Sequence, residues 1–229
     1  MKEVMIQFLQ RQLLRWFDEN GRAFPWRDPS ASKYQQILSE ILLQRTRAET
    51  VARYYDRFFA RYPDWKALSR ATVEELEEIM RPLGLYRHRA RRLFRLGQDL
   101  KRRRGRVPGT SDELADSGFA GLYAINAFEL FALRKRKPLL DVNMSRVLKR
   151  YFNAGEFMDV RRDKALQALA NDVIEVRRCK ELNWAILDLA ALVCTRRSPS
   201  CGTCALNPRC LYRQRGLEAR ETGVPLNDL

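Results

Sequence analysis

Residues 194–210 read CTRRSPSCGTCALNPRC and contain four of the five cysteines of this 229-residue chain. These four are Cys194, Cys201, Cys204 and Cys210, with gaps of six, two and five residues between them. Four thiolates this close in sequence can supply all the soft ligands of an iron–sulfur cluster or of a structural zinc ion. Structural zinc usually takes two short C-x-x-C pairs joined by a longer arm, whereas here one short pair is flanked by two wide loops. The spacing therefore favours one [4Fe-4S] cluster, with zinc as the alternative and disulfide bonds as the weakest interpretation.

The N-terminal residues show no targeting signal. Residues 1–10 include Lys2 and Glu3, and they lack both a sustained apolar run and a small-residue cleavage site. No apolar stretch in the chain approaches the roughly 20 residues that a membrane-spanning helix needs. We therefore expect an intracellular protein, cytoplasmic or associated with the nucleoid, without a membrane partner.

The chain is strongly basic. It has 43 Lys and Arg against 28 Asp and Glu, a formal net charge of +15, while its 45% hydrophobic content is ordinary for a folded protein. The charge is concentrated in residues 86–107, YRHRARRLFRLGQDLKRRRGRV, where Asp99 is the single acid. Leucines at helical spacing give this segment an apolar side, so a solvated helix face is the ordinary interpretation. A face this one-sided on a chain this basic instead favours a polyanion as partner, and phosphate backbones are the usual one.

Apolar residues recur at helical spacing along most of the chain. Ser32 is a suitable N-cap for one such stripe, and Thr72 followed by Glu75 predicts a capping box at the start of another. A further helix is expected to begin near Asp141. The other segments with this pattern are residues 5–13, 34–42, 48–61, 72–80, 88–103, 162–177 and 182–193. No strand-like alternation or internal repeat competes with it, so the predicted fold class is all-α.

Residues 117–123, SGFAGLY, predict a glycine turn between two short helices. Backbone N–H groups at such a turn can bind a phosphate without reading the base sequence. A glycine turn alone is weak evidence, because such turns join helices in many proteins. Its position is more informative, since Asp141 follows Tyr123 by eighteen residues in the segment PLLDVNMSRVLKR.

Taken together, these motifs resemble the endonuclease III superfamily of helix-hairpin-helix DNA glycosylases, closest to the branch that acts on thymine–guanine and adenine mismatches. In the hairpin, only Gly121 clearly matches the family pattern of leucine, proline, glycine, an apolar residue and glycine. The cysteine spacing is the one that this superfamily uses. The other matching motifs are FPWR (24–27), SEILLQRT (39–46), LGLYRHRARRL (83–93), LDVNMSRV (140–147) and DLAALVCTRRSPSCGTC (188–204).

The resemblance implies a two-lobed helical fold with two domains. An iron–sulfur cluster domain is expected from both ends of the chain, residues 1–28 and 136–229. A barrel-like helical domain is expected over residues 29–135, with the helix-hairpin-helix near residues 113–126.

The resemblance also implies three catalytic residues. Base release passes through an oxocarbenium-like transition state, so the enzyme needs an anion near the sugar and a proton for the leaving base. Asp141 takes the first role, and as an aspartate it also suits the N-cap position of the helix after it. Glu40 takes the second role if it faces the base pocket, where partial burial would raise its pKa; a solvated helix glutamate is the ordinary alternative. Bifunctional members carry a lysine nucleophile at the position of Tyr123, and a tyrosine cannot form a Schiff base, so a monofunctional enzyme is expected.

Five residues are expected to contact DNA. Gln44 matches the side chain that fills the gap left by the flipped base, and Arg45 stands where adenine-removing members usually have a second glutamine. Gly121 belongs to the hairpin turn. Arg196 and Arg197, in the cysteine loop, are expected to reach phosphates.

The expected substrate is thymine or uracil opposite guanine. Arg45 and the segment LGLYRHRARRL favour these bases over adenine opposite guanine or oxidised guanine. The chain also ends nineteen residues after Cys210, so the extra C-terminal domain of adenine-removing members is expected to be absent. The expected partner is double-stranded DNA with a mismatched or damaged base, bound by a monomer. The alternative from another class is a DNA-binding iron–sulfur protein without catalysis, although a pure binder would need neither Asp141 nor Glu40.

Overall fold

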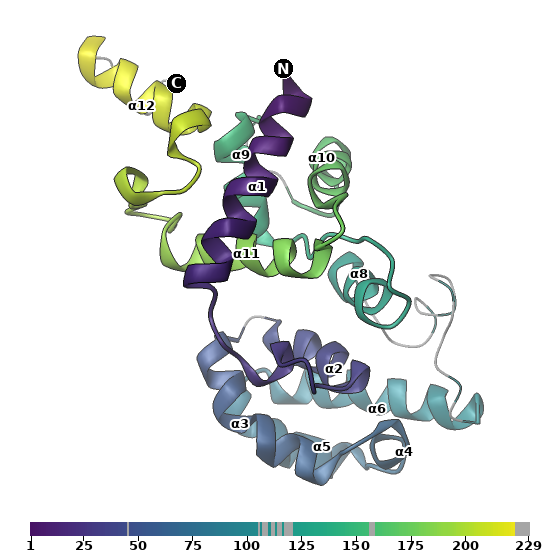
Figure 1. The fold of residues 1–229 in the computed structure, drawn as a ribbon. Helices are drawn as coiled ribbons and strands as arrows, with labels where there is room; N and C mark the ends of the chain where they lie inside the picture. Colours follow the sequence, from purple (N-terminus) through teal and green to yellow (C-terminus); the bar gives the residue numbers. More distant parts are fainter. Residues whose placement is uncertain are drawn as a thin grey trace. The chain divides into compact units, whose positions relative to one another are not determined.

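The structure is a computed structural model of the 229-residue chain. It describes residues 1–44, 46–104, 106, 110, 113, 116, 121–155 and 159–217, and the backbone alone of residues 218–222. Within these ranges the regular elements are helices and no strand occurs, so the all-α prediction is confirmed (Figure 1). None of the described helices combines the length and the apolar character needed to cross a membrane.

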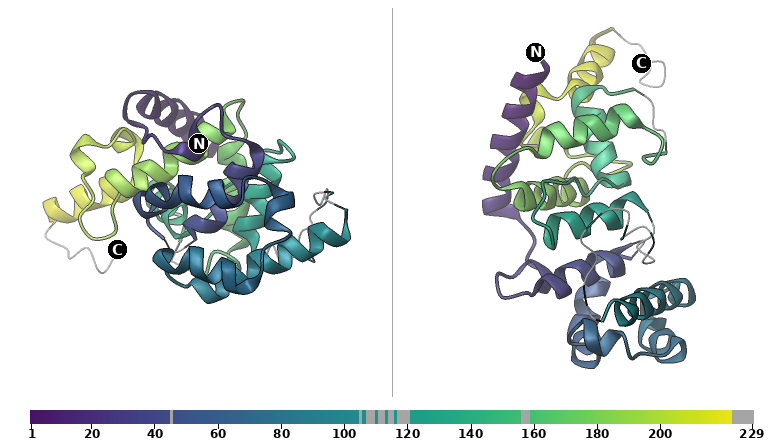
Figure 2. Two further views of the ribbon diagram at one scale, coloured as in Figure 1. Left: turned by 90° about the horizontal axis from the view of Figure 1, so that it is seen from below. Right: turned by 90° about the vertical axis from the view of Figure 1, so that its right-hand side faces the viewer.

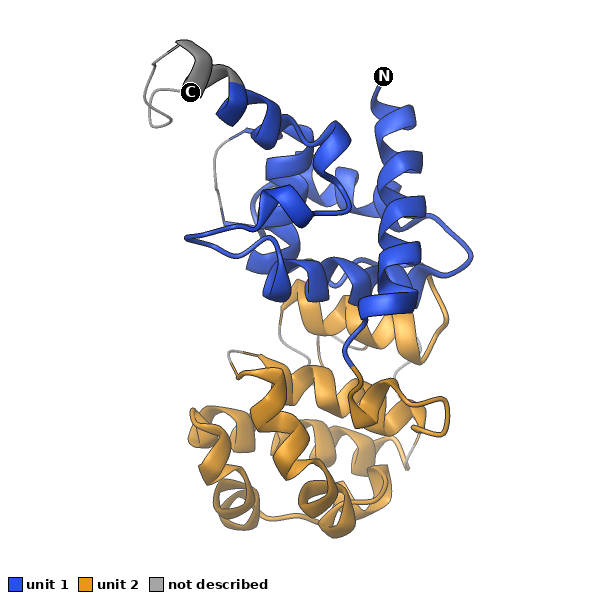
Figure 3. Ribbon diagram, turned by 60° about the vertical axis from the view of Figure 1, so that its left-hand side comes forward, with its two compact units in different colours: residues 1–22, 136–229 blue, residues 23–135 orange. Residues whose placement is uncertain are grey.

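The chain divides into two compact units (Figure 3). Unit 1 comprises Met1–Arg22 and Arg136–Leu229, and unit 2 comprises Ala23–Lys135. The first boundary lies six residues earlier than the one expected after residue 28, because the segment after Arg22, which includes the FPWR motif, groups with unit 2.

Unit 2 is built around helix α2, Lys33–Leu43. Ser32 caps it through a capping box with Gln35, which fixes where the helix begins. Eight of its eleven residues are buried, since α3 and α8 both pack against it. Polar side chains on α2 are therefore held inside the unit. The other elements are η1 (Pro25–Arg27), α3 (Ala48–Arg61), α4 (Trp65–Leu68), α5 (Val73–Met80), η2 (Arg81–Leu83), α6 (Tyr86–Arg102) and α8 (Leu122–Phe131).

Helix α6 carries most of the basic segment, and it packs against α4 and α5. Its Leu93 and Leu96 are buried at 1% and 2% exposure, which confirms the apolar side expected for this helix. Gly97 allows α4 to approach closely, because a Cβ atom there would lie 2.9 Å from the main-chain oxygen of Leu68. The capping box expected at the start of α5 is also present, with Glu75 N donating to Thr72 Oγ1 and Thr72 N donating to Glu75.

Unit 1 joins the two ends of the chain. Helix α1 (Lys2–Asn20) packs against α10 (Lys164–Ile174) and α11 (Cys179–Leu192), and α9 (Val142–Phe152) packs on α11 from the same unit (Figures 1 and 2). The fully buried Asp188 of α11 accepts hydrogen bonds from N and Nε of Arg22 at 2.9 and 2.8 Å. The C-terminal elements are η3 (Cys201–Thr203), η4 (Asn207–Arg209) and α12 (Leu211–Thr222), and α12 packs on α9.

Candidate active site and cysteine site

Glu40 and Tyr123 form a hydrogen-bonded pair inside unit 2. Glu40 lies on α2 and is 2% exposed, so it is not a solvated helix glutamate. Tyr123 lies in the first turn of α8, and its hydroxyl donates to Oε2 of Glu40 at 2.6 Å. The structure thus brings together two of the three residues predicted to be catalytic.

Gly121 precedes α8 with φ = +98°, a backbone conformation that other residues rarely adopt. No atom of a described residue lies within 4 Å of the position that a Cβ atom would occupy there. Residues 117–120 of the predicted hairpin lie outside the described residues. Phosphate binding by this turn therefore stays a prediction.

Gln44 directly follows α2, and two arginines of α6 hold it. Nη1 of Arg92 donates to the side-chain Oε1 of Gln44 at 2.7 Å, and Nη2 of Arg89 donates to its main-chain oxygen. Arg89 also donates to Oγ1 of Thr46 at 2.6 Å and to the main-chain oxygen of Leu83 at 3.2 Å. Burial lowers the pKa of both guanidinium groups from its ordinary value. Arg45 lies outside the described residues.

Asp141 is the N-cap of α9, as its position in the sequence predicts. Its Oδ1 accepts from the main-chain nitrogens of Asn143 and Met144, both at 2.8 Å, and its Oδ2 accepts from Nδ2 of Asn143 at 2.7 Å. Burial raises the pKa of the Asp141 carboxyl above its ordinary value, and these hydrogen bonds oppose that shift only in part. The carboxylate is therefore fixed in position by local backbone and side-chain donors.

Helix α9 also connects Asp141 to the cysteine loop within unit 1. Nη1 of Arg146 donates to Oδ1 of Asn143 at 3.1 Å, and its Nε donates to the main-chain oxygen of Cys194 at 2.8 Å. One turn later, Nη1 of Arg150 lies 3.4 Å from Sγ of Cys194 and donates to the main-chain oxygen of Thr195 at 2.7 Å. A continuous set of hydrogen bonds therefore runs from the Asp141 carboxylate to the first cysteine.

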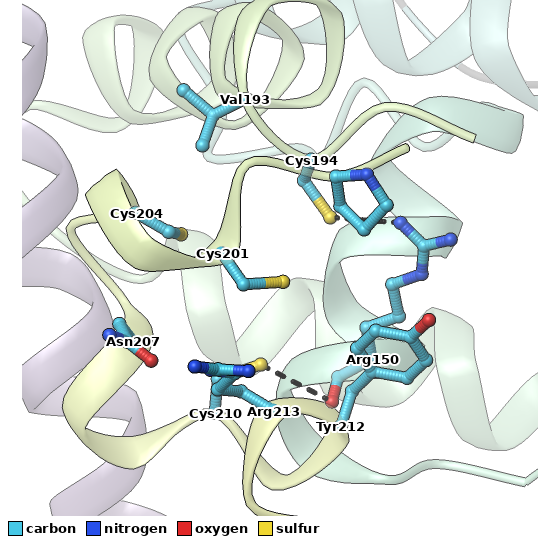
Figure 4. Close-up of a pocket in the computed structure, with 10 residues that line it drawn as sticks. Arg150, Val193, Cys194, Cys201, Cys204, Asn207, Cys210, Tyr212 and Arg213 are labelled. Carbon is cyan, nitrogen blue, oxygen red and sulfur yellow. Dashed lines mark hydrogen bonds between the residues drawn. The ribbon is translucent and has the colours of Figure 1, made fainter. Parts of the chain in front are cut away.

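The four C-terminal cysteines line one pocket together with Arg150 and Tyr212 (Figure 4). All of them carry free thiols, which contradicts the disulfide interpretation. Burial, reinforced by the neighbouring thiols, raises the pKa of Cys204 to about 11 and also raises that of Cys210. Thiols of this kind carry little charge at neutral pH unless cations bind beside them. The donor set therefore fits a thiolate-bound metal group.

No three Cys, His, Asp or Glu side chains in the described part of the chain converge on a point that could hold one metal ion. A mononuclear zinc site needs four sulfur atoms at about 2.3 Å from a shared centre. The spacing of the cysteines, one short pair between two wide loops, is therefore the feature that favours the cluster over zinc.

Arg196 and Arg197 lie in the loop between the first two cysteines, and both are exposed. Nη2 of Arg150 donates to the main-chain oxygen of Arg196 at 2.9 Å, which holds this part of the loop against α9. Neither side chain forms an ion pair with a described residue. Their charges are therefore available to an external anion.

Residues 38–175 match the model of the HhH-GPD superfamily of base excision DNA repair proteins, which covers more than half of the chain. The chain belongs to this superfamily. The HhH-GPD relatives include the thymine-DNA glycosylase of Aeropyrum pernix, 34% identical over 90% of this chain and 95% of the relative. They also include the thymine/uracil-DNA glycosylase of Pyrobaculum aerophilum, 35% identical over 89% of this chain and 90% of the relative.

The adenine DNA glycosylase of Mycobacterium tuberculosis is 31% identical over 89% of this chain and 67% of the relative. Among solved structures, a thermostable thymine-DNA glycosylase aligns with a TM-score of 0.82 at 29% identity, over 93% of this chain and 98% of that one. The family and the fold predicted from the motifs are confirmed.

The sequence interpretation missed the arginines that position these groups. The sequence places Arg89 and Arg92 in one basic, phosphate-facing run, whereas both side chains bind Gln44. A signal was available, because each lies four residues before a buried leucine, Leu93 or Leu96, and so shares the apolar side of α6. Arg146 and Arg150 also bind main-chain oxygens more than 40 residues along the chain, and no sequence pattern marks such partners.

Proposed function

We propose that this HhH-GPD protein is a monofunctional DNA glycosylase of base excision repair that hydrolyses the N-glycosidic bond of thymine or uracil opposite guanine. The observation that carries the proposal is the buried Glu40 paired with Tyr123 at 2.6 Å, because it sets an acid beside a residue that cannot form an imine. The thymine- and uracil-acting relatives support the substrate class, since the chain covers nearly their whole length.

In this proposal Asp141 supplies the negative charge that the sugar cation needs. Three donors fix its carboxylate before any substrate binds, so little reorganisation is required when positive charge develops. The same carboxylate can orient the attacking water. Its role as helix cap serves catalysis, because the cap sets where the charge lies.

Glu40 provides or passes a proton to the departing base, and Tyr123 holds its carboxyl group through the shared hydrogen bond. A tyrosine hydroxyl has no nitrogen with which to form an imine on the sugar carbon, so water is the nucleophile and the product is an abasic site in an intact strand. The DNA partner is bound through Gln44, Gly121 and the exposed arginines Arg196 and Arg197.

The cofactor in this proposal is one [4Fe-4S] cluster held by Cys194, Cys201, Cys204 and Cys210. When bound, such a cluster ties the loop that carries Arg196 and Arg197 into a fixed shape, and we assign it no redox step. The free thiols around one pocket support this assignment, as does the guanidinium of Arg150, 3.4 Å from the sulfur of Cys194, which offsets thiolate charge.

The substrate assignment is tested with labelled duplexes that carry T:G, U:G, A:G or adenine opposite oxidised guanine, followed by alkali. We expect alkali-dependent cleavage at T:G and U:G, and little product without alkali because an abasic site in an intact strand is the end product. Faster removal of adenine from A:G or from the oxidised-guanine duplex would replace this assignment with the adenine alternative. Binding without base release from any of the four would support the non-catalytic alternative.

The cluster assignment is tested by Cys204→Ser, with Cys179→Ser as the matched control on a cysteine outside the pocket. We expect purified protein to absorb broadly at about 400 nm. Cys204→Ser should lose this absorbance, lower the melting temperature by roughly 5 °C or more and weaken DNA binding. Cys179→Ser should change none of the three. Colourless protein with one zinc per chain would contradict the assignment.

A further inference from the structure

The amide of Gln44 has a fixed orientation in unit 2. A guanidinium has donors and no acceptor, so only the oxygen of the Gln44 amide can face Nη1 of Arg92, at 2.7 Å. The oxygen and nitrogen of an amide are similar in shape, but only the oxygen can accept a hydrogen bond from Arg92, and this fixes the orientation. The Nε2 group of Gln44 then points away from Arg92, and it makes no hydrogen bond to a described residue.

The main chain beside this amide is fixed as well. Arg89 donates to the main-chain oxygen of Gln44, to Oγ1 of Thr46 and to the main-chain oxygen of Leu83, so one guanidinium joins both ends of this loop to α6. Thr46 Oγ1 also donates to the oxygen of Leu83 at 3.1 Å. Both acceptors of Gln44 are therefore occupied by arginines, and the half-buried side chain offers only N–H donors to a ligand.

We propose that Arg92 is a positioning residue that makes Gln44 a donor-only probe, which selects a base with a carbonyl at the O6 position opposite the base that is removed. The inference rests on the proposed function, in which Gln44 enters the gap left by the flipped base. Guanine and adenine both present an N7 acceptor, so they differ at position 6, where guanine has the O6 acceptor and adenine has the N6 amino donor. An amide that can only donate matches O6 and opposes N6, since the adenine edge would place one donor against another.

This arrangement explains why a buried arginine, Arg89, and a half-buried one, Arg92, lie beside a neutral glutamine. A free glutamine could rotate its amide by half a turn and present either its oxygen or its nitrogen. Arg92 removes that choice before binding, and fixing one long side chain in advance improves affinity by roughly 2- to 10-fold. The selectivity thus comes from the orientation of Gln44 and not from the charge of Arg92.

The test measures dissociation constants by fluorescence anisotropy, at one salt concentration, for duplexes with a tetrahydrofuran abasic analogue opposite guanine, hypoxanthine, 2-aminopurine or adenine. Hypoxanthine keeps O6 and lacks the N2 amino group, whereas 2-aminopurine keeps N2 and lacks O6. We expect wild-type protein to bind the two O6-bearing duplexes roughly 5-fold more tightly than the other two, the value of one net hydrogen bond.

Arg92→Gln should reduce this ratio below about 2-fold, because a glutamine at 92 can donate or accept and no longer dictates the Gln44 orientation. The matched control is Arg91→Gln, which removes the same charge from an exposed neighbour on α6. It should weaken all four duplexes equally through lost phosphate attraction and keep the ratio. Gln44→Glu leaves Arg92 paired and presents an acceptor, so it should abolish or reverse the preference even if Arg92→Gln folds poorly.

An unchanged ratio in Arg92→Gln or in Gln44→Glu would overturn the inference, as would wild-type protein that does not distinguish hypoxanthine from 2-aminopurine. If wild-type protein binds none of the abasic duplexes more tightly than intact duplex, the proposed function fails, and the inference that rests on it fails with it. Base-excision assays on T:G separate the two cases, because the inference can fail while excision proceeds.

Discussion

Asp141→Asn should lower the single-turnover rate of base excision by about 100-fold or more, on the order of 3 kcal/mol, with DNA binding retained. The substitution keeps the size of the side chain and removes the negative charge proposed to face the sugar cation. The two main-chain donors at 2.8 Å can still bond to the oxygen of the new amide, so the start of α9 should be preserved. Single-turnover kinetics on U:G or T:G duplexes measure the rate, and anisotropy with an abasic duplex measures the binding.

Asp141→Asn also changes the hydrogen bonds around residue 141. An asparagine amide in place of Oδ2 would set its donors against Nδ2 of Asn143, now 2.7 Å from that oxygen. Asn143 cannot simply turn around, because its own oxygen accepts from Arg146 at 3.1 Å. Breaking these hydrogen bonds would also lower the excision rate, so the single variant alone does not separate this effect from the loss of the catalytic charge.

The double variant Asp141→Asn, Asn143→Asp separates these two effects. A carboxylate at 143 can accept from the new amide and from Arg146, so stability should recover, while the charge stays away from position 141. We expect excision to remain low in the double variant. Recovery of excision together with stability would show that the network, and not a charge at position 141, is what the reaction needs.

The pH dependence gives a second check. Burial raises the pKa of Asp141, so its protonated form persists to higher pH than that of an ordinary aspartate, whose pKa is about 3.9. Excision by wild-type protein should accordingly fall on acidification at a pH above that value, since the reaction needs the carboxylate. Asp141→Asn should lack this acid limb.

Local signals in the sequence were sufficient for the helices and for the residues at their ends. The capping box at Thr72, the cap at Asp141 and the grouping of four cysteines are each decided by residues a few positions apart, and the structure has all three. The helix boundaries agree less well with the expected ones. Helix α11 begins at Cys179, three residues before the expected start, because residues 179–181 are helical but add little to the apolar pattern.

The positioning groups could not be predicted in the same way. Arg92 bonds to Gln44 across 48 residues, and Arg146 bonds to Cys194 across the same separation. In sequence these arginines resemble the exposed arginines around them, because the local sequence does not indicate which side chains face the interior of the protein. Their roles depend on tertiary contacts, which place the side-chain oxygen of Gln44 and the main-chain oxygen of Cys194 beside a helix that carries an arginine donor.

Tyr123→Lys should create strand cleavage that needs no alkali, together with a covalent protein–DNA complex that borohydride traps. The new amine would replace a hydroxyl that lies 2.6 Å from a carboxylate oxygen of Glu40, a side chain that is 2% exposed. Burial lowers the pKa of a lysine, which favours the neutral, nucleophilic amine, whereas an ionised Glu40 raises it. Cleavage should thus depend on the neutral form of the new amine, and it should fall as the pH drops and the amine becomes protonated.

The matched control is Tyr123→Arg, which introduces the same charge at the same position but has no amine that can form an imine. It should give no trapped complex and no cleavage above the wild-type level, so any gain in the lysine variant must come from its amine. Tyr123→Phe removes only the hydrogen bond to Glu40 and should lower excision, by about 10-fold for one hydrogen bond to a charged group, without adding cleavage. Efficient trapping by wild-type protein would mean that a lysine already present attacks the sugar. In that case the reaction is not monofunctional, and Tyr123 does not decide its course.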